Sequence, residues 1–206
     1  MERFIWTVLS PCVVDKNVRP RNVEPLEDAV AYTSILHFFF AYPERTFTLS
    51  ELAKSTGTPK TTAGRVVEQL IAEAFLHRDE VGRSWQLKAQ RTHPFFMTRK
   101  IPDNLRLVYE SGVIDQILRN WPAARCVILF GSYRKGDDTE ASDVDIAIEI
   151  PGDGPLELVE LGKARLGFRT KAVRFVGHFF RRKTVDKNLF ANIANGIVLA
   201  GFLEVR

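Results

Sequence analysis

The sequence predicts an α+β protein with two domains, and three observations support this fold class. Apolar residues at helical spacing dominate the first half, where they predict three helices followed by a short hairpin. Two apolar segments, at 127–130 and 144–150, are typical of buried strands and are separated by a glycine-containing turn. The 206 residues are 45% hydrophobic and include 15 phenylalanines, which is enough for two small cores rather than one large core.

We expect the first domain to span residues 1–90, including an N-terminal extension in which residues 1–9 predict a strand rather than a signal peptide. A connecting segment and a helix are expected over residues 91–122. The second domain is expected to span residues 123–206.

Three helices are predicted within the first domain. The first covers residues 25–41, and the second covers residues 48–54 with Thr48 or Ser50 as its N-cap. After a turn that contains glycine, the third covers residues 59–76 and has a proline at its first position. The order of helix, glycine turn and helix is that of a helix-turn-helix motif.

Residues 75–87 predict two short strands around Gly82, which would form a wing after the third helix. The first domain therefore resembles the winged helix-turn-helix domains of prokaryotic transcription regulators. The resemblance implies double-stranded DNA as a partner, contacted by hydrogen-bonding and basic side chains at the start of the third helix and on the wing. The candidates for these contacts are Thr58, Lys60, Thr61, Thr62, Arg65, Arg78 and Arg83.

An alternative for this domain is protein contact or dimerisation, because the candidate basic patch is small. The formal charge is only +4 and the isoelectric point is about 9.2, so attraction to DNA would be modest. The run Phe38-Phe39-Phe40 predicts a core or a homodimer face.

The segment 90–103 is expected to cross between the domains with Phe95, Phe96 and Met97 buried, and residues 105–118 predict a helix. Later in the chain we expect a helix over residues 156–166 and a strand over residues 172–180. A further helix is expected over residues 188–199, and a short strand or tail over residues 201–205.

The most informative stretch begins where the apolar strand 127–130 enters Gly131-Ser132. Further along, Asp143 and Asp145 alternate with the apolar residues of the next strand, so both carboxylates are expected on one face, outside the core. Two neighbouring carboxylates suit Mg²⁺, or Mn²⁺, held together with substrate phosphates. The Gly-Ser turn opens a short helix and offers backbone N–H groups and a hydroxyl to a phosphate.

Arg134 and Lys135 follow directly and would neutralise phosphate charge. Gly131 would let the backbone approach a ligand closely. Together with Ser132, these residues predict a binding site for a metal–nucleoside triphosphate.

The motif Leu129-Phe130-Gly131-Ser132, then Gly136, then Ser142-Asp143-Val144-Asp145 resembles the nucleotidyltransferase superfamily related to DNA polymerase beta. It is most similar to the minimal nucleotidyltransferase branch, which includes small antibiotic nucleotidyltransferases and toxin–antitoxin partners. The resemblance implies an α/β domain with a small mixed sheet. It also implies transfer of a nucleoside monophosphate from a metal–nucleoside triphosphate to an acceptor hydroxyl.

The sequence departs from the family at the third acidic residue, which family members carry on a later strand. The strand predicted at 172–180 contains no acid. His178 is expected at this position as a base, with Arg174 as the alternative if the strand has a different register. Asp186 is expected to cap a helix rather than to bind metal.

The missing acid leaves a second function open, in which the chain is a DNA-binding regulator. Its nucleotidyltransferase domain would then be degenerate and would serve as a nucleotide sensor or dimerisation unit. A weaker third possibility is an antitoxin-like role with a partner protein. Residues 163–187 contain nine Lys or Arg and one acid, so they form either a solvated face or a basic border of the cleft. With only two cysteines and no apolar stretch of membrane-spanning length, the sequence predicts a cytoplasmic protein.

Overall fold

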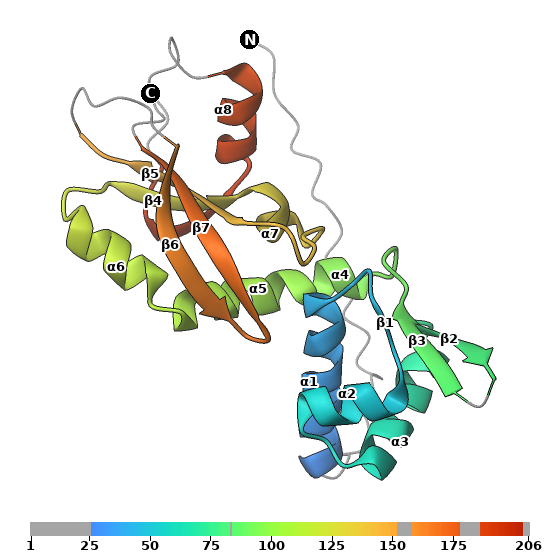
Figure 1. The fold of residues 1–206 in the computed structure, drawn as a ribbon. Coiled ribbons are helices and arrows are strands. Elements are labelled where there is room, and N and C mark those ends of the chain that lie inside the picture. The colour runs from blue at the N-terminus through green and yellow to red at the C-terminus, as the bar shows by residue number, and fades with distance from the viewer. Residues whose placement is uncertain (1–25, 83, 152–157, 178–185, 204–206) are drawn as a thin grey trace, which may run out of the picture.

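The computed structural model describes residues 26–82, 84–151, 158–177 and 186–203. Helices and a three-stranded sheet form the N-terminal part, and a five-stranded sheet forms the C-terminal part (Figure 1). The helix pair α4–α5 runs between the two parts (Figure 1). This is the mixed α+β architecture that the sequence predicts.

The N-terminal part contains a helix-turn-helix motif followed by a hairpin. Its elements are α1 (Leu26–Ala41), β1 (Thr46–Phe47), α2 (Leu49–Thr56), α3 (Lys60–Ala72), β2 (Leu76–Val81) and β3 (Ser84–Ala89). All strand pairs are antiparallel, in the order β1-β3-β2. Thr48 caps α2, and its hydroxyl accepts a hydrogen bond from the Glu51 backbone N–H. The N-terminal strand expected at residues 1–9 lies outside the described residues.

The third helix is shorter than predicted, because it ends at Ala72 instead of continuing to residue 76. Ala74 has a φ of 60° in the left-handed region, so the chain leaves the helix there. Phe75 is fully buried just after this turn and packs against phenylalanines from the other elements. Phe38, Phe39 and Phe40 all belong to the same core, so the phenylalanine run is core in this structure.

The connecting part consists of α4 (Phe95–Thr98), α5 (Lys100–Glu110) and α6 (Val113–Asn120). The helix expected over 105–118 is therefore two helices, because Gly112 has a φ of 75° and ends the helical path. Phe96 is buried as expected, but the expectation for Met97 was wrong, since its side chain is 70% exposed.

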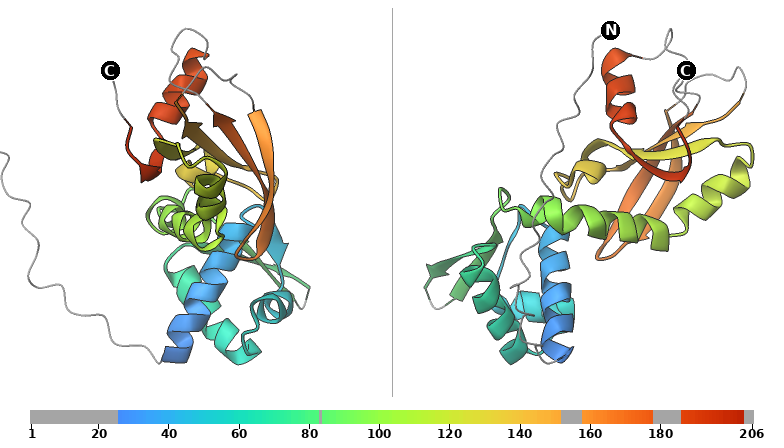
Figure 2. Two further views of the ribbon diagram at one scale, coloured as in Figure 1. Left: turned by 90° about the vertical axis from the view of Figure 1, so that its left-hand side faces the viewer. Right: turned by 180° about the vertical axis from the view of Figure 1, so that it is seen from behind.

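The C-terminal part is built on a mixed sheet with strand order β6-β7-β5-β4-β8. Its elements are β4 (Cys126–Phe130), α7 (Gly131–Lys135), β5 (Val144–Glu149), β6 (Leu158–Leu166), β7 (Arg169–Gly177), α8 (Lys187–Ala194) and β8 (Ile197–Gly201). The pair β5–β7 is parallel, and the other pairs are antiparallel. Helices α5 and α6 pack on one face of the sheet and α8 packs on the other (Figures 1 and 2).

Two predictions in this part were wrong. Residues 158–166 form strand β6 instead of a helix, and the period of two is visible where Ala164 and Leu166 are buried while Lys163 and Arg165 are exposed. The helix expected over 188–199 ends at Ala194, and the chain continues as strand β8.

The two parts touch through the hairpin between β6 and β7. Phe168 at its tip packs edge-on against Phe38 of α1, with 5.3 Å between the ring centroids. The Tyr42 hydroxyl donates a hydrogen bond of 3.2 Å to the Phe168 carbonyl. The first part therefore contacts the turn that leads into β7, and β7 pairs with β5, which borders the site described below. No helix in the described ranges has the length and apolar character needed to cross a lipid bilayer.

Candidate active site

The site forms where β4 ends and β5 begins. In the antiparallel pair β4–β5, Phe130 is opposite Asp145, so the Asp145 carboxylate lies beside the start of α7. Gly131 has a φ of 73°, and a Cβ atom there would overlap Asp145 Oδ2 and lie 3.2 Å from its Cγ. The absence of a side chain at Gly131 therefore leaves space for the Asp145 carboxylate. This role is additional to the one predicted from the sequence, which was to let a ligand approach the backbone. Helix α7 has only five residues, so its dipole is small and the contribution of this turn to binding an anion comes mainly from its N–H groups.

Gly131→Ala is expected to abolish cation-dependent nucleotide binding, because the new methyl group would displace Asp145. Gly112→Ala is a matched control, since Gly112 has a φ of 75° and no atom within 4 Å of an added Cβ. Both variants carry the same backbone strain, of roughly 1–2 kcal/mol for an L residue in the left-handed region. Calorimetric titration with nucleotide and Mn²⁺ measures the difference, and equal affinity in the two variants would contradict this role of Gly131.

Asp143 and Asp145 approach the site from the same side of β5. Asp145 is half-buried, and its pKa is raised by burial and then by the nearby charge of Asp143. The rest of this face is not open as the sequence suggested, because Ala147 is fully buried in the core beneath α8. Asp143 and Asp145 therefore lie at the beginning of this face, before it becomes buried at Ala147.

Arg174 is the β7 residue that lies opposite Asp145 in the parallel β5–β7 register. Its Nη2 is 2.9 Å from Asp143 Oδ2. His178, the other candidate for this position, lies outside the described residues; it follows Gly177, which is opposite Ile148 further along β5. The register therefore places Arg174, the alternative that the sequence left open, beside the two aspartates.

The oxygen donors present suit one hard divalent cation bound together with phosphates. Within the described ranges, no three His, Cys, Asp or Glu residues come together in a group able to hold a metal ion. Two carboxylates with substrate oxygens are a usual donor set for Mg²⁺. Asp186 is not among these donors, because its side chain accepts hydrogen bonds from the N–H groups of Asn188 and Leu189 as a helix cap, as expected.

The other predicted nucleotide-binding residues lie on α7. Ser132 is half-buried, and its hydroxyl has no hydrogen-bond partner among the described residues. Lys135 is exposed, and Arg134 is half-buried with its Nε unpaired in the part of the chain described here. The Ser132 hydroxyl and the exposed Lys135 ammonium are therefore the donors that an anion at the turn can reach.

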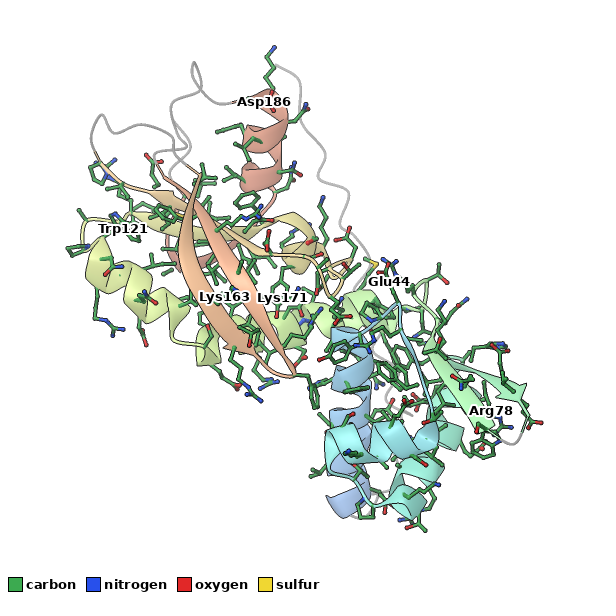
Figure 3. All side chains as sticks on the ribbon, viewed as in Figure 1. Glu44, Arg78, Trp121, Lys163, Lys171 and Asp186 are labelled. Atoms are coloured by element: carbon green, nitrogen blue, oxygen red, sulfur yellow. The ribbon has the colours of Figure 1, made fainter. Side chains whose placement is uncertain are left out.

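The loop between α7 and β5 is held by a buried charged cluster that the sequence did not reveal. At its centre, Asp138 is fully buried and lies 2.9 Å from Lys100 Nζ and 3.0 Å from Arg169 Nη2. Asn104 donates a hydrogen bond of 2.8 Å to the same carboxylate. Lys171 Nζ is 4.0 Å from it, and Figure 3 shows Lys171 on β7. We call these five residues the Asp138 cluster.

The Asp138 cluster supports the residue just before Asp143. Lys171 Nζ donates hydrogen bonds to the carbonyls of Thr139 and Ser142, so β7 fixes the end of the loop. Burial and then the neighbouring charge of Arg169 lower the pKa of Lys171 to about 8, and burial lowers the pKa of Lys100. Arg169 and Lys171 therefore do not form an open basic border of the cleft. Nothing in the sequence separates buried Asp138 from exposed Asp137 beside it.

The candidate DNA-contacting residues have different surroundings. Lys60 and Thr61 are exposed at the start of α3, but Arg65 Nη2 is 2.9 Å from Asp28 Oδ1 on α1. Thr58 and Thr62 are half-buried and line a groove of about 480 Å³ between α1 and the α2–α3 turn. Arg83 lies outside the described residues, and the Arg78 guanidinium stacks over the Trp85 ring.

Two family models match the sequence, in the order that it predicts. Residues 33–80 match the IclR helix-turn-helix domain, and residues 111–190 match the nucleotidyltransferase domain. No curated protein gives a significant match to the chain. The first match covers α1 to β2, and the second covers the Gly-Ser turn, both aspartates and β7.

Proposed function

The chain contains a nucleotidyltransferase domain preceded by an IclR helix-turn-helix domain, and from this we propose that it transfers a nucleoside monophosphate to an acceptor hydroxyl. The single observation that supports this most strongly is the placement of Asp143 and Asp145 beside the Gly131-Ser132 turn. We keep the division into residues 1–90, 91–122 and 123–206 as the proposed functional units.

In the proposed reaction, the Ser132 hydroxyl and the N–H groups of the turn bind the triphosphate, with Lys135 and Arg134 adding positive charge. Asp143 and Asp145 would hold Mg²⁺ or Mn²⁺. When bound, this cation would neutralise the charge that develops on the phosphates during transfer. The acceptor hydroxyl loses its proton to the solvent as its oxygen forms a bond to the α-phosphorus, and the bond from the α-phosphorus to the pyrophosphate leaving group breaks.

For the N-terminal domain we propose double-stranded DNA as the partner, contacted through Lys60, Thr61 and neighbouring residues of α3. Both side chains are exposed at the start of α3, which is the second helix of the helix-turn-helix motif. This supports the proposal, since the start of that helix usually reaches base edges in the major groove. Each phosphate that a basic side chain neutralises steepens the slope of log affinity against log salt concentration by about one. The few basic side chains here therefore predict that DNA affinity falls only slowly as salt is added.

A second candidate function is supported by the ion pair between Arg174 and Asp143. An arginine in this place argues for a domain that binds nucleotide without turning it over and acts as a sensor for the DNA-binding domain. The two candidates share the nucleotide site and differ only in the transfer step.

The test is incubation of the full chain with each α-³²P nucleoside triphosphate and Mg²⁺ or Mn²⁺, with separation of labelled products, including the chain itself. We expect transfer of labelled nucleoside monophosphate in the wild type and at least a hundredfold less in Asp143→Asn, since loss of a charge-stabilising group commonly costs about 10²–10³ in rate. Asp137→Asn is the matched control, because Asp137 is an exposed acid in the same loop. Equal transfer of label in wild type and Asp143→Asn would defeat the proposed mechanism, and nucleotide binding without transfer would favour the sensor.

A further inference from the structure

We propose that Arg174 supplies the positive charge beside Asp143 that a metal ion would otherwise supply, and that it gives up this position when nucleotide and a cation bind. Without nucleotide, its guanidinium neutralises Asp143; with nucleotide, it turns to the phosphates while a single divalent cation binds the two aspartates. This inference rests on the proposed function, because it specifies how that nucleotide site obtains its positive charge. It predicts that nucleotide binding is only partly dependent on a divalent cation.

The geometry places Arg174 within reach of both aspartates. Its Nη2 is 2.9 Å from Asp143 Oδ2, and its backbone is opposite Asp145 in the β5–β7 register. Adjacent strands are about 4.8 Å apart, so Arg174 is a nearest neighbour of Asp145 across the sheet. On β7, the flanking residues Val173 and Phe175 are buried on the α5–α6 side, which leaves Arg174 on the side of the aspartates.

The charge of the site supports a competition. Two ionised aspartates carry a charge of −2, and the guanidinium reduces the net charge of the three groups to −1. A divalent cation that approaches Asp143 must displace the guanidinium or be repelled by it. Since charges a few ångströms apart interact more strongly near a protein surface than in bulk water, loss of the guanidinium is expected to raise the cation affinity of the site.

The exposure of the pair allows the arginine to move. The side chain of Arg174 is 50% exposed and that of Asp143 is 26% exposed, whereas the neighbouring Arg169 is 8% exposed and belongs to the Asp138 cluster. An exposed ion pair contributes little to stability, so its rearrangement costs little. A guanidinium also offers paired donors that match a phosphate, which makes the triphosphate a favourable second partner.

The experiment compares wild type, Arg174→Gln and Arg174→Lys in two titrations of the full chain. In the first, Mn²⁺ alone is followed by electron paramagnetic resonance, and Arg174→Gln is expected to bind Mn²⁺ about tenfold more tightly than the wild type. In the second, ATP, GTP, CTP and UTP are titrated in EDTA. We expect the wild type to bind, Arg174→Gln to lose about tenfold in affinity, and Arg174→Lys to lie between them.

Arg165→Gln is the matched control, because it removes the same charge from an exposed position on β6. Unchanged Mn²⁺ affinity in Arg174→Gln, or unchanged nucleotide affinity in EDTA, would overturn the role of Arg174. If the wild type binds nucleotide with Mn²⁺ but Arg174→Gln has wild-type affinity in both titrations, only this inference fails. If the wild type binds no nucleotide under any condition, the proposed function fails together with it.

Discussion

Asp138→Ala is expected to lower the free energy of unfolding by about 3–5 kcal/mol, because it leaves buried positive charges without their counter-ion. Lys100, Arg169 and Lys171 all lie within 4.0 Å of the Asp138 carboxylate. The carboxylate also accepts a hydrogen bond from Asn104, which would keep only its hydrogen bond to the Tyr133 carbonyl. Denaturant unfolding of the full chain, followed by circular dichroism, measures the loss.

The matched control is Asp137→Ala, since Asp137 precedes Asp138 and is exposed. A surface substitution of this kind is expected to change stability by no more than about 0.5 kcal/mol. Equal stability of Asp138→Ala and Asp137→Ala would contradict the claim that the Asp138 cluster stabilises the loop before Asp143.

Asp145→Asn is expected to stabilise the fold while it abolishes cation-dependent nucleotide binding. Burial and the charge of Asp143 raise the pKa of Asp145 above its ordinary value. A carboxyl group with a raised pKa contributes stability that is complete below its unfolded pKa and is lost as the pH rises through its folded pKa. At neutral pH the ionised Asp145 therefore costs stability, and an uncharged amide of similar size removes this cost.

The difference in stability is expected to be largest near neutral pH and to disappear below about pH 4, the ordinary pKa of an aspartate, since the carboxyl is then protonated in both the folded and the unfolded wild type. Thermal unfolding at a series of pH values measures it. Asp143→Asn is the comparison, because it removes one cause of the raised pKa of Asp145 but also breaks the ion pair with Arg174, worth about 0–1 kcal/mol. It is therefore expected to lose binding and to gain less stability than Asp145→Asn. A less stable Asp145→Asn at neutral pH would contradict this account.

The spacing of apolar residues in the sequence predicted much of the fold and part of the site. Alternation along 144–150 placed Val144, Ile146 and Ile148 in the core and both aspartates on the other side. The same reasoning gave the wrong structure for residues 158–166, because a short apolar segment fits either a helix or a strand and only its pairing with β7 decides.

The rest of the site depends on contacts that a sequence does not contain. Whether Arg174 or His178 stands beside Asp145 is a question of strand register, which follows from pairing between β5 and β7. Burial of Asp138 depends on Lys100, which comes from a helix 38 residues earlier in the chain. The sequence predicted that Gly131 lets a ligand approach the backbone, but its closeness to Asp145 could be seen only in the structure.

The most direct test of the central claim is the binding of ATP, GTP, CTP and UTP to the full chain, with and without Mg²⁺ or Mn²⁺, in the wild type and Asp143→Asn. Binding precedes the choice of acceptor, so this measurement needs no assumption about the substrate that is modified. We predict that a divalent cation strengthens nucleotide binding in the wild type and has no effect in Asp143→Asn. Absence of nucleotide binding in the wild type, or an equal effect of the cation in both proteins, would contradict a nucleotide site built on these aspartates.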